Sequence, residues 1–278
     1  MGPAGLSYGA PNRGHLVGGV ELPKRGPGYV LLRPTDRTRF GLPALVSLVQ
    51  RAAADVAARH PGAAPLRVAD LSSPRGGKHS RHASHRTGRD VDLLFYVTDA
   101  SGRPAGNGGW PSIDRFGLVH IRGAGADGDA ASSAAGAPRF FDTARNWSLV
   151  RALLSDPEVP LRWIFCSRGI KARLLRFAAS HERDADLLAR AATILHQPSR
   201  GRPHDDHFHV RIACNAQQRS GGCRDYGDPW VWDRAVADPI AASPALDDAT
   251  LVQLIMKPIG DEPAPAAPAQ PAQPAGAI

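Results

Sequence analysis

The chain has 278 residues and a net charge of +8, with 42% hydrophobic and 22% charged residues. That length forms one large domain or two small ones and can bury a real core. Glycine (29) and proline (25) make up about a fifth of the chain and aromatic residues 6%, which disfavours a long helical bundle. No window of about 18 uncharged apolar residues occurs, so a transmembrane segment is excluded. The N-terminal residues also lack the basic and apolar regions of a signal peptide.

The positive charge first suggests a nucleic-acid partner. However, 30 of the 34 basic residues are arginine, and they are spread along a chain rich in Ala, Gly and Pro, as genome composition would produce. No helical face studded with arginine and aromatic residues is present. We therefore expect no nucleic-acid partner, whereas an anionic polymer such as cell wall is compatible with a basic surface.

In chain order, the first forty residues are punctuated by Gly and Pro and predict loops. A helix is expected from Leu42 to about Arg59. Pro43 suits its first turn, apolar residues recur at helical spacing, and His60-Pro61 ends the pattern.

Short apolar runs predict strands farther along the chain. LRVADL (66–71) and DVDLLFYV (90–97) are expected to be strands joined by the polar loop 72–89, and the Gly- and Ala-rich residues 100–138 predict long loops. The later elements are expected to be a helix around Ala144 to Leu154, a strand at Leu161 to Cys166, one or two helices between Ile170 and His196, and a strand at His207 to Ile212.

Strands and helices are mixed without a regular βαβ alternation, which predicts the α+β class. We expect a single domain with a central, mainly antiparallel sheet flanked by helices and long loops. A loop-rich N-terminal segment (1–40) would pack on this domain (41–240). The Pro- and Ala-rich residues 260–278 cannot bury a core and are predicted to form a disordered tail.

The histidines carry the strongest functional signal. Histidine clusters with carboxylates close by are typical of zinc sites. Six of the 11 histidines lie in two short clusters, namely His79, His82 and His85, and His204, His207 and His209.

Strand periodicity sharpens this interpretation. In the last predicted strand His207, His209 and Arg211 share one face, and the apolar residues between them can face the core. Asp90 and Asp92 likewise share one face of their strand. A loop histidine, a strand aspartate and a strand histidine would supply three ligands and leave a fourth position for water, as in catalytic zinc sites. The alternative, solvated polar loops, is weakened because each cluster adjoins an apolar strand.

Other motifs are weak or absent. GAGADG at 123–128 matches a dinucleotide-binding fingerprint by letters only, because no amphipathic helix follows it. His181-Glu182 lacks the second histidine of HExxH, since Ala185 stands there. The three cysteines contain no CxxC pair, which disfavours a structural zinc site.

RHASHRTGRDVDLLF, followed far downstream by HDDHFHVRIAC, resembles the penicillin-insensitive murein endopeptidases. These belong to a zinc peptidase group that also holds D-Ala-D-Ala carboxypeptidases and hedgehog-type domains. The similarity extends from about Gly14 to Cys223. The H-x6-D and HxH patterns are common to the group, whereas HASH-x-TG-x-DVD is more specific to the murein endopeptidases.

The resemblance implies a ligand set for Zn²⁺. It matches His85, Asp92 and His209 to the three zinc ligands, and so selects Asp92 over Asp90. It places His82 close to the metal, where this histidine would ligate or assist.

The resemblance also implies two catalytic histidines. His207 would lie beside the zinc-activated water as general base or stabiliser, with His204 as a further active-site residue. Asp205, Asp206 or a backbone carbonyl would fix the histidine tautomers. His79 has no counterpart in the family and is predicted to be a solvated loop residue.

The activity implied is zinc-dependent hydrolysis of D-alanyl-meso-diaminopimelyl cross-links in peptidoglycan, in the periplasm. A disulfide between Cys214 and Cys223 is implied as well, which leaves Cys166 as a buried thiol. The alternatives are a D-Ala-D-Ala carboxypeptidase or L-Ala-D-Glu peptidase of the same group, and a catalytically silent zinc-binding cell-wall module. The sequence leaves the oligomeric state open.

Overall fold

A seven-stranded sheet forms the centre of the computed structural model, which describes residues 5–122, 137–199 and 201–232. Two neighbouring pairs, β15–β14 and β7–β5, are parallel and the other four are antiparallel, which confirms the mainly antiparallel sheet. In spatial order the strands are β15 (Leu195–His196), β14 (Leu161–Phe165), β16 (His207–Ile212), β8 (Asp90–Leu94), β7 (Leu66–Val68), β5 (Tyr29–Leu31) and β4 (Arg25–Gly26).

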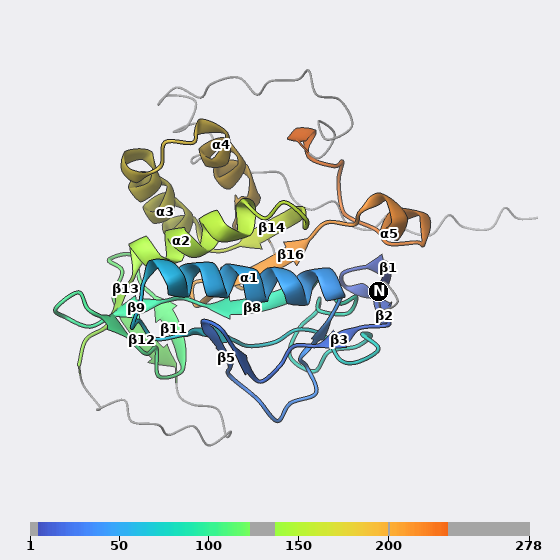
Figure 1. The fold of residues 1–278 in the computed structure, drawn as a ribbon, viewed down its shortest axis with the longest axis horizontal. Helices are drawn as coiled ribbons and strands as arrows, with labels where there is room; N and C mark the ends of the chain where they lie inside the picture. The colour runs from blue at the N-terminus through green and yellow to red at the C-terminus, as the bar shows by residue number, and fades with distance from the viewer. Residues whose placement is uncertain (1–4, 123–136, 200, 233–278) are drawn as a thin grey trace, which may run out of the picture.

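Four helices pack together with the sheet in one hydrophobic core. Figure 1 shows the first two of them side by side across the sheet. The apolar residues of β16, Phe208, Val210 and Ile212, are at most 2% exposed and belong to this core. The opposite face of the sheet therefore receives the polar residues of the same strand. The helices are α1 (Pro43–Arg59), α2 (Thr143–Leu154), α3 (Arg168–His181) and α4 (Ala185–Ile194).

Local sequence explains where the helices begin. Pro43 occupies the first turn of α1, where its missing N–H leaves no hydrogen bond unmade. The other three helices start after an oxygen-bearing side chain that accepts a backbone N–H, a typical N-cap. These caps are Asp142 for α2, Ser167 for α3 and Asp184 for α4. No helix within the described ranges is long and apolar enough to cross a membrane.

The long-loop predictions are partly wrong. The N-terminal forty residues and the described part of 100–138 contain short strands, which are too short and too glycine-rich to show a clear alternation of apolar residues. Besides β4 and β5 of the central sheet, the strands in these two regions are β1 (Leu6–Ala10), β2 (Arg13–Val17), β3 (Val20–Glu21), β6 (Phe40–Gly41), β10 (Pro104–Ala105), β11 (Trp110–Ile113) and β12 (Val119–Arg122). Just outside them, β9 (Val97–Thr98) and β13 (Phe140–Phe141) form a three-stranded sheet with β10.

Other differences are smaller. The strand expected at 90–97 divides, because β8 ends at Leu94 and β9 pairs in a different sheet. A short helix, α5 (Ala216–Ser220), was not expected. The GAGADG loop at 123–128 and the tail at 260–278 lie outside the described residues.

The cysteines are arranged as the resemblance implies. Cys214 and Cys223 form a disulfide. Cys166 is buried, and this burial raises the pKa of its thiol to about 12. A thiol held protonated in this way is unreactive.

Replacing Phe208 tests the core behind the polar strand face. Phe208 is fully buried and packs edge-to-face on Phe95 with ring centroids 4.8 Å apart. Phe208→Ala should lower the free energy of unfolding by about 3–5 kcal/mol in chemical denaturation. Phe116→Ala, at a side chain that is 72% exposed, should change it by less than about 0.5 kcal/mol. Similar losses in the two variants would contradict this packing.

Candidate metal centre

Strands β16 and β8 bring the polar residues together through their register. His209 pairs with Asp92 and Arg211 pairs with Asp90 in the antiparallel ladder. Directly opposed residues point to the same face of a sheet with their Cβ atoms about 5 Å apart. The alternation read from the sequence thus places these four side chains on one face, away from the helical core.

The loop 72–89 carries His85 to the same face. The fully buried Ser72 holds the end of this loop in place. The Ser72 hydroxyl donates to the His85 carbonyl at 2.7 Å and accepts from the Gly88 N–H at 2.9 Å. Gly88 turns the chain with φ of 74°. Among the described residues other than glycine, only His85 and His204 have positive φ, and strained backbone of this kind clusters at functional sites.

Three ring nitrogens converge on one carboxylate oxygen. Asp92 Oδ1 lies 3.2 Å from His85 Nε2, and 3.3 Å from both His207 Nε2 and His209 Nδ1. Two ligands on a tetrahedral ion with bonds of about 2.0–2.1 Å are separated by about 3.3 Å. The spacing around Asp92 therefore matches that of a coordinated zinc-sized ion.

Several of these atoms are buried without a hydrogen bond. They are both oxygens of Asp92 and the Nε2 atoms of His85 and His207. Most buried polar atoms in proteins have a hydrogen-bond partner, and a group of unpaired atoms facing one another indicates a binding site for a cation. The donor set thus fits a metal ion. By mutual distance, the potential metal ligands form two groups of three side chains: His82, His85 and Asp92, and His204, His207 and His209. Asp92 connects the two groups, because its Oδ1 lies 3.3 Å from ring nitrogens of both His207 and His209.

Groups behind the histidines fix their orientation. His209 Nε2 donates to Asp90 Oδ1 at 2.8 Å, and the same oxygen accepts from Arg211 Nε at 2.6 Å. His85 Nδ1 donates to the Leu71 carbonyl at 3.2 Å. Hydrogen bonds of this kind leave the opposite ring nitrogen with its lone pair directed at the centre, as in metal-binding histidines. Asp90, the rival to Asp92 on spacing, thus lies behind a histidine and not at the centre.

His207 and His204 have separate supports. His207 Nδ1 donates to Asp206 Oδ1 at 2.6 Å, and His204 Nδ1 donates to the Arg202 carbonyl at 2.9 Å. The sequence left Asp205, Asp206 and a backbone carbonyl open as tautomer-fixing groups. Asp206 and a carbonyl take these roles, while Asp205 accepts from the Ser112 hydroxyl at 2.9 Å.

His82 is shared between two carboxylates. Its Nε2 lies 2.9 Å from Asp70 Oδ2 and 3.3 Å from Asp92 Oδ2. Asp70 is 1% exposed and also accepts hydrogen bonds from Arg33, Arg81 and Thr38. Sequence reasoning missed Asp70, because it stands alone after a short strand with no histidine at ligand spacing.

The prediction that His79 is a solvated loop residue is wrong. The residue is 5% exposed, and its Nδ1 accepts the Arg81 backbone N–H at 3.1 Å. Its ring packs on that of His82 with centroids 4.8 Å apart. The loop closes over the site and carries His79 inward with the other histidines.

The electrostatics favour the metal-binding charge states of Asp92 and His209, whereas at His85 the charge of Asp92 outweighs burial and raises the pKa of the ring. Burial opposes ionisation of Asp92, but His85 and His207 outweigh it and hold the pKa of this carboxyl well below its usual range. Burial lowers the pKa of His209 to about 4 and that of His204 to about 3, so both rings are neutral at pH 7. For His207 burial is outweighed by Asp92 and Asp206, which raise its pKa to about 10. An ionised aspartate and a neutral histidine are the forms that bind metals.

Comparison with known proteins identifies the family of this chain. The family model described as penicillin-insensitive murein endopeptidase matches residues 7–230. The chain belongs to this family. It is therefore a peptidase of a metallopeptidase family.

Named relatives support this assignment. A Klebsiella pneumoniae protein named penicillin-insensitive murein endopeptidase is 28% identical over 230 residues, which cover 82% of this chain and 73% of that protein. An Escherichia coli protein of the same name is 28% identical over 211 residues, which cover 76% and 67%. The resemblance inferred from the histidine motifs is thus confirmed over most of the chain.

Two glycines with the same backbone conformation test the loop that carries His85. Gly88 and Gly62 have φ of 74° and 75°, but a Cβ on Gly88 would meet Leu16 Cδ1 at 2.6 Å, whereas none of the described atoms lies within 4 Å at Gly62. Gly62→Ala should cost about 1–2 kcal/mol of unfolding free energy. Gly88→Ala should cost about 1–3 kcal/mol more, because the buried Leu16 cannot withdraw. Equal costs in denaturant titrations would show that packing does not constrain this turn.

Proposed function

We propose that the protein is a zinc-dependent endopeptidase that hydrolyses D-alanyl-meso-diaminopimelyl cross-links of peptidoglycan in the periplasm. The observation that carries the zinc assignment is the convergence of ring nitrogens on the buried carboxylate of Asp92. Imidazole and carboxylate donors without thiolate suit a catalytic zinc ion. The names of the family and its relatives support murein as the substrate, and the disulfide supports an oxidising compartment.

In this proposal His85 Nε2, Asp92 Oδ1 and His209 Nδ1 hold the zinc ion. His82 assists and does not ligate, because its Nε2 hydrogen-bonds to Asp70. The ring of His82 would keep both carboxylates in place beside the metal.

When bound, the zinc ion supplies Lewis acidity that polarises the scissile carbonyl and favours ionisation of water. His207 acts as general base at Nε2, since its Nδ1–H is held by Asp206 and a zinc ion bound at Asp92 would offset the carboxylate charge that raises the pKa of this ring. It takes a proton from the attacking water as the oxygen adds to the carbonyl carbon. It then gives that proton to the departing amine nitrogen as the C–N bond breaks. Asp206 stabilises the imidazolium between these two transfers.

His204 orients the water in this scheme. Its Nδ1–H is committed to the Arg202 carbonyl, so its Nε2 is a hydrogen-bond acceptor while the ring is neutral. Its ring centroid lies 5.1 Å from that of His207, close enough for one water molecule to contact both rings.

Digestion of purified diaminopimelate-type muropeptide dimers, read by mass spectrometry, tests this function. The protein should convert each dimer to two intact monomers, and a chelator should abolish the reaction until zinc is added back. Loss of a terminal D-Ala alone would instead indicate a carboxypeptidase. Cleavage between L-Ala and D-Glu would indicate an L-Ala-D-Glu peptidase. Zinc binding without any cleavage would favour the silent binding module.

Variants separate metal binding from proton transfer. Asp92→Ala should lose both zinc and activity, while Asp186→Ala, at an exposed aspartate of α4, should keep both. His207→Ala should retain zinc near one ion per chain but lose about 10²- to 10⁴-fold in kcat. His120→Ala, at a side chain 61% exposed, is the matched control. Zinc is measured by elemental analysis after dialysis, and near-normal turnover of His207→Ala would refute its role as base.

A further inference from the structure

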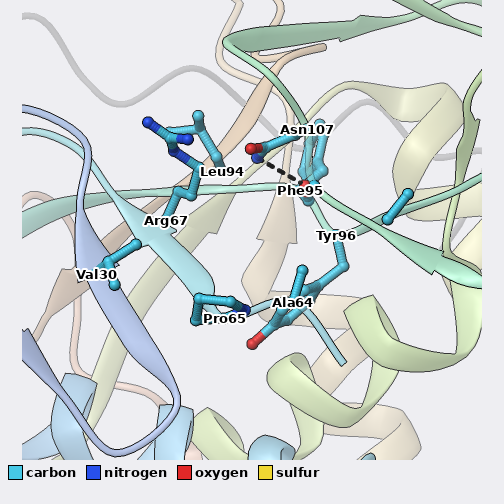
Figure 2. A pocket seen from close by; sticks show the side chains of 10 residues that line it. Val30, Ala64, Pro65, Arg67, Leu94, Phe95, Tyr96 and Asn107 are labelled. Atoms are coloured by element: carbon cyan, nitrogen blue, oxygen red, sulfur yellow. Dashed lines mark hydrogen bonds between the residues drawn. The ribbon is translucent and has the colours of Figure 1, made fainter. Parts of the chain in front are cut away.

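A small pocket lies on the same face of the sheet as the metal centre. It has a volume of about 100 Å³ and is lined by β5, β7, the end of β8 and the loop around Asn107 (Figure 2). Neither the proposed zinc ligands nor the catalytic histidines line it. Its walls are mainly apolar, with Val30, Pro65 and Leu94 among them.

The register of the sheet connects this pocket to the metal centre. His207 pairs with Leu94, and the pairing of Val68 with Leu93 brings Arg67 beside Leu94. Arg67 in turn pairs with Val30. Neighbouring strands lie about 4.8 Å apart, so Arg67 is about 10 Å from His207 along one row of the sheet.

Two polar residues, Arg67 and Asn107, line the pocket. Asn107 is 6% exposed, and its Nδ2 donates to the Phe95 carbonyl at 3.3 Å, while its Oδ1 is buried without a hydrogen bond. Figure 2 shows the Asn107 carboxamide and the Arg67 guanidinium on the same side of the pocket. Arg67 has a further interaction partner in the structure, so a ligand would share or exchange that partner.

This combination selects a particular ligand chemistry. The Asn107 oxygen requires an N–H donor, and the Arg67 guanidinium favours a carboxylate. The apolar walls and small volume admit only a short aliphatic group between them. An amide N–H and a free carboxylate on one small carbon frame describe the C-terminal residue of a peptide, such as alanine.

We propose that this pocket is the subsite for the small C-terminal residue of a peptidoglycan peptide, with Arg67 and Asn107 as its specificity-determining residues. This inference rests on the proposed function. The distance fits, because about 10 Å corresponds to some three residues of extended peptide from the scissile bond. The pocket would thus bind the free C-terminal residue of a peptide stem while the metal centre hydrolyses the cross-link.

Paired substrates test the subsite. One muropeptide dimer carries a free C-terminal carboxylate and the other a C-terminal amide. The unmodified protein should cleave the amide with kcat/KM lower by about tenfold or more, mainly through KM. Arg67→Ala should show the same loss on the carboxylate substrate and no longer distinguish the two, whereas Asn107→Leu should weaken both substrates alike and keep the preference for the carboxylate. Arg67→Lys should restore part of the preference, and Arg103→Ala, at a side chain 81% exposed, should behave as the unmodified protein.

A binding measurement separates this inference from the proposed function. N-acetyl-D-alanine is titrated into full-length His207→Ala by NMR, with N-acetyl-D-alaninamide as control, so no turnover is involved. Saturable shifts at Asn107 with the acid only, weakened tenfold or more by adding Arg67→Ala, would support the subsite even if no dimer were cleaved. Efficient dimer cleavage with equal kcat/KM for acid and amide, or acid binding unaffected by Arg67→Ala, would overturn the subsite and leave the proposed function intact.

Discussion

The buried charge of Asp92 is the constraint on which the rest of the site depends. A carboxylate removed from water costs several kcal/mol unless positive charge or hydrogen bonds compensate it. Both oxygens of Asp92 are buried without a hydrogen bond, yet three ring nitrogens lie within 3.3 Å of Oδ1. A single cation bound among these atoms would neutralise the carboxylate and use the lone pairs of the surrounding rings. Outside them, Asp90 and Asp206 hold two of the three rings that face Asp92.

The sheet makes this arrangement rigid. On β16 every second side chain enters the helical core, and the fully buried Phe208 lies between His207 and His209, the two histidines of this strand that face Asp92. A slip of one residue in the register would exchange the core and polar faces, so core packing and site geometry specify the same pairing. Residues on strands also hold their positions more accurately than residues on loops. His85 is on a loop, and the bonds of Ser72 to both sides of its turn supply the missing rigidity.

The predictable part of the structure followed from strict periodicity. The alternation of β16 placed His207, His209 and Arg211 on one face, and helical spacing with Pro43 located α1 almost to the residue. Contacts between distant segments could not be read in this way. Asp70 reaches His82 only because the loop 72–89 folds back, and the burial of His79 has the same origin. Asp206, and not Asp205, hydrogen-bonds to His207 because of the backbone conformation just before β16. The sequence does not reveal this, since both positions are aspartate.

The most direct test of the central claim is a crystal structure of the zinc-loaded protein with anomalous data at the zinc edge. We expect one strong anomalous peak per chain, bonded to His85 Nε2, Asp92 Oδ1 and His209 Nδ1 at about 2.0–2.2 Å, with His207 near the ion but not bonded to it. A peak held instead by His204 and His207, or no peak beside Asp92, would contradict the account of how this buried carboxylate organises the site.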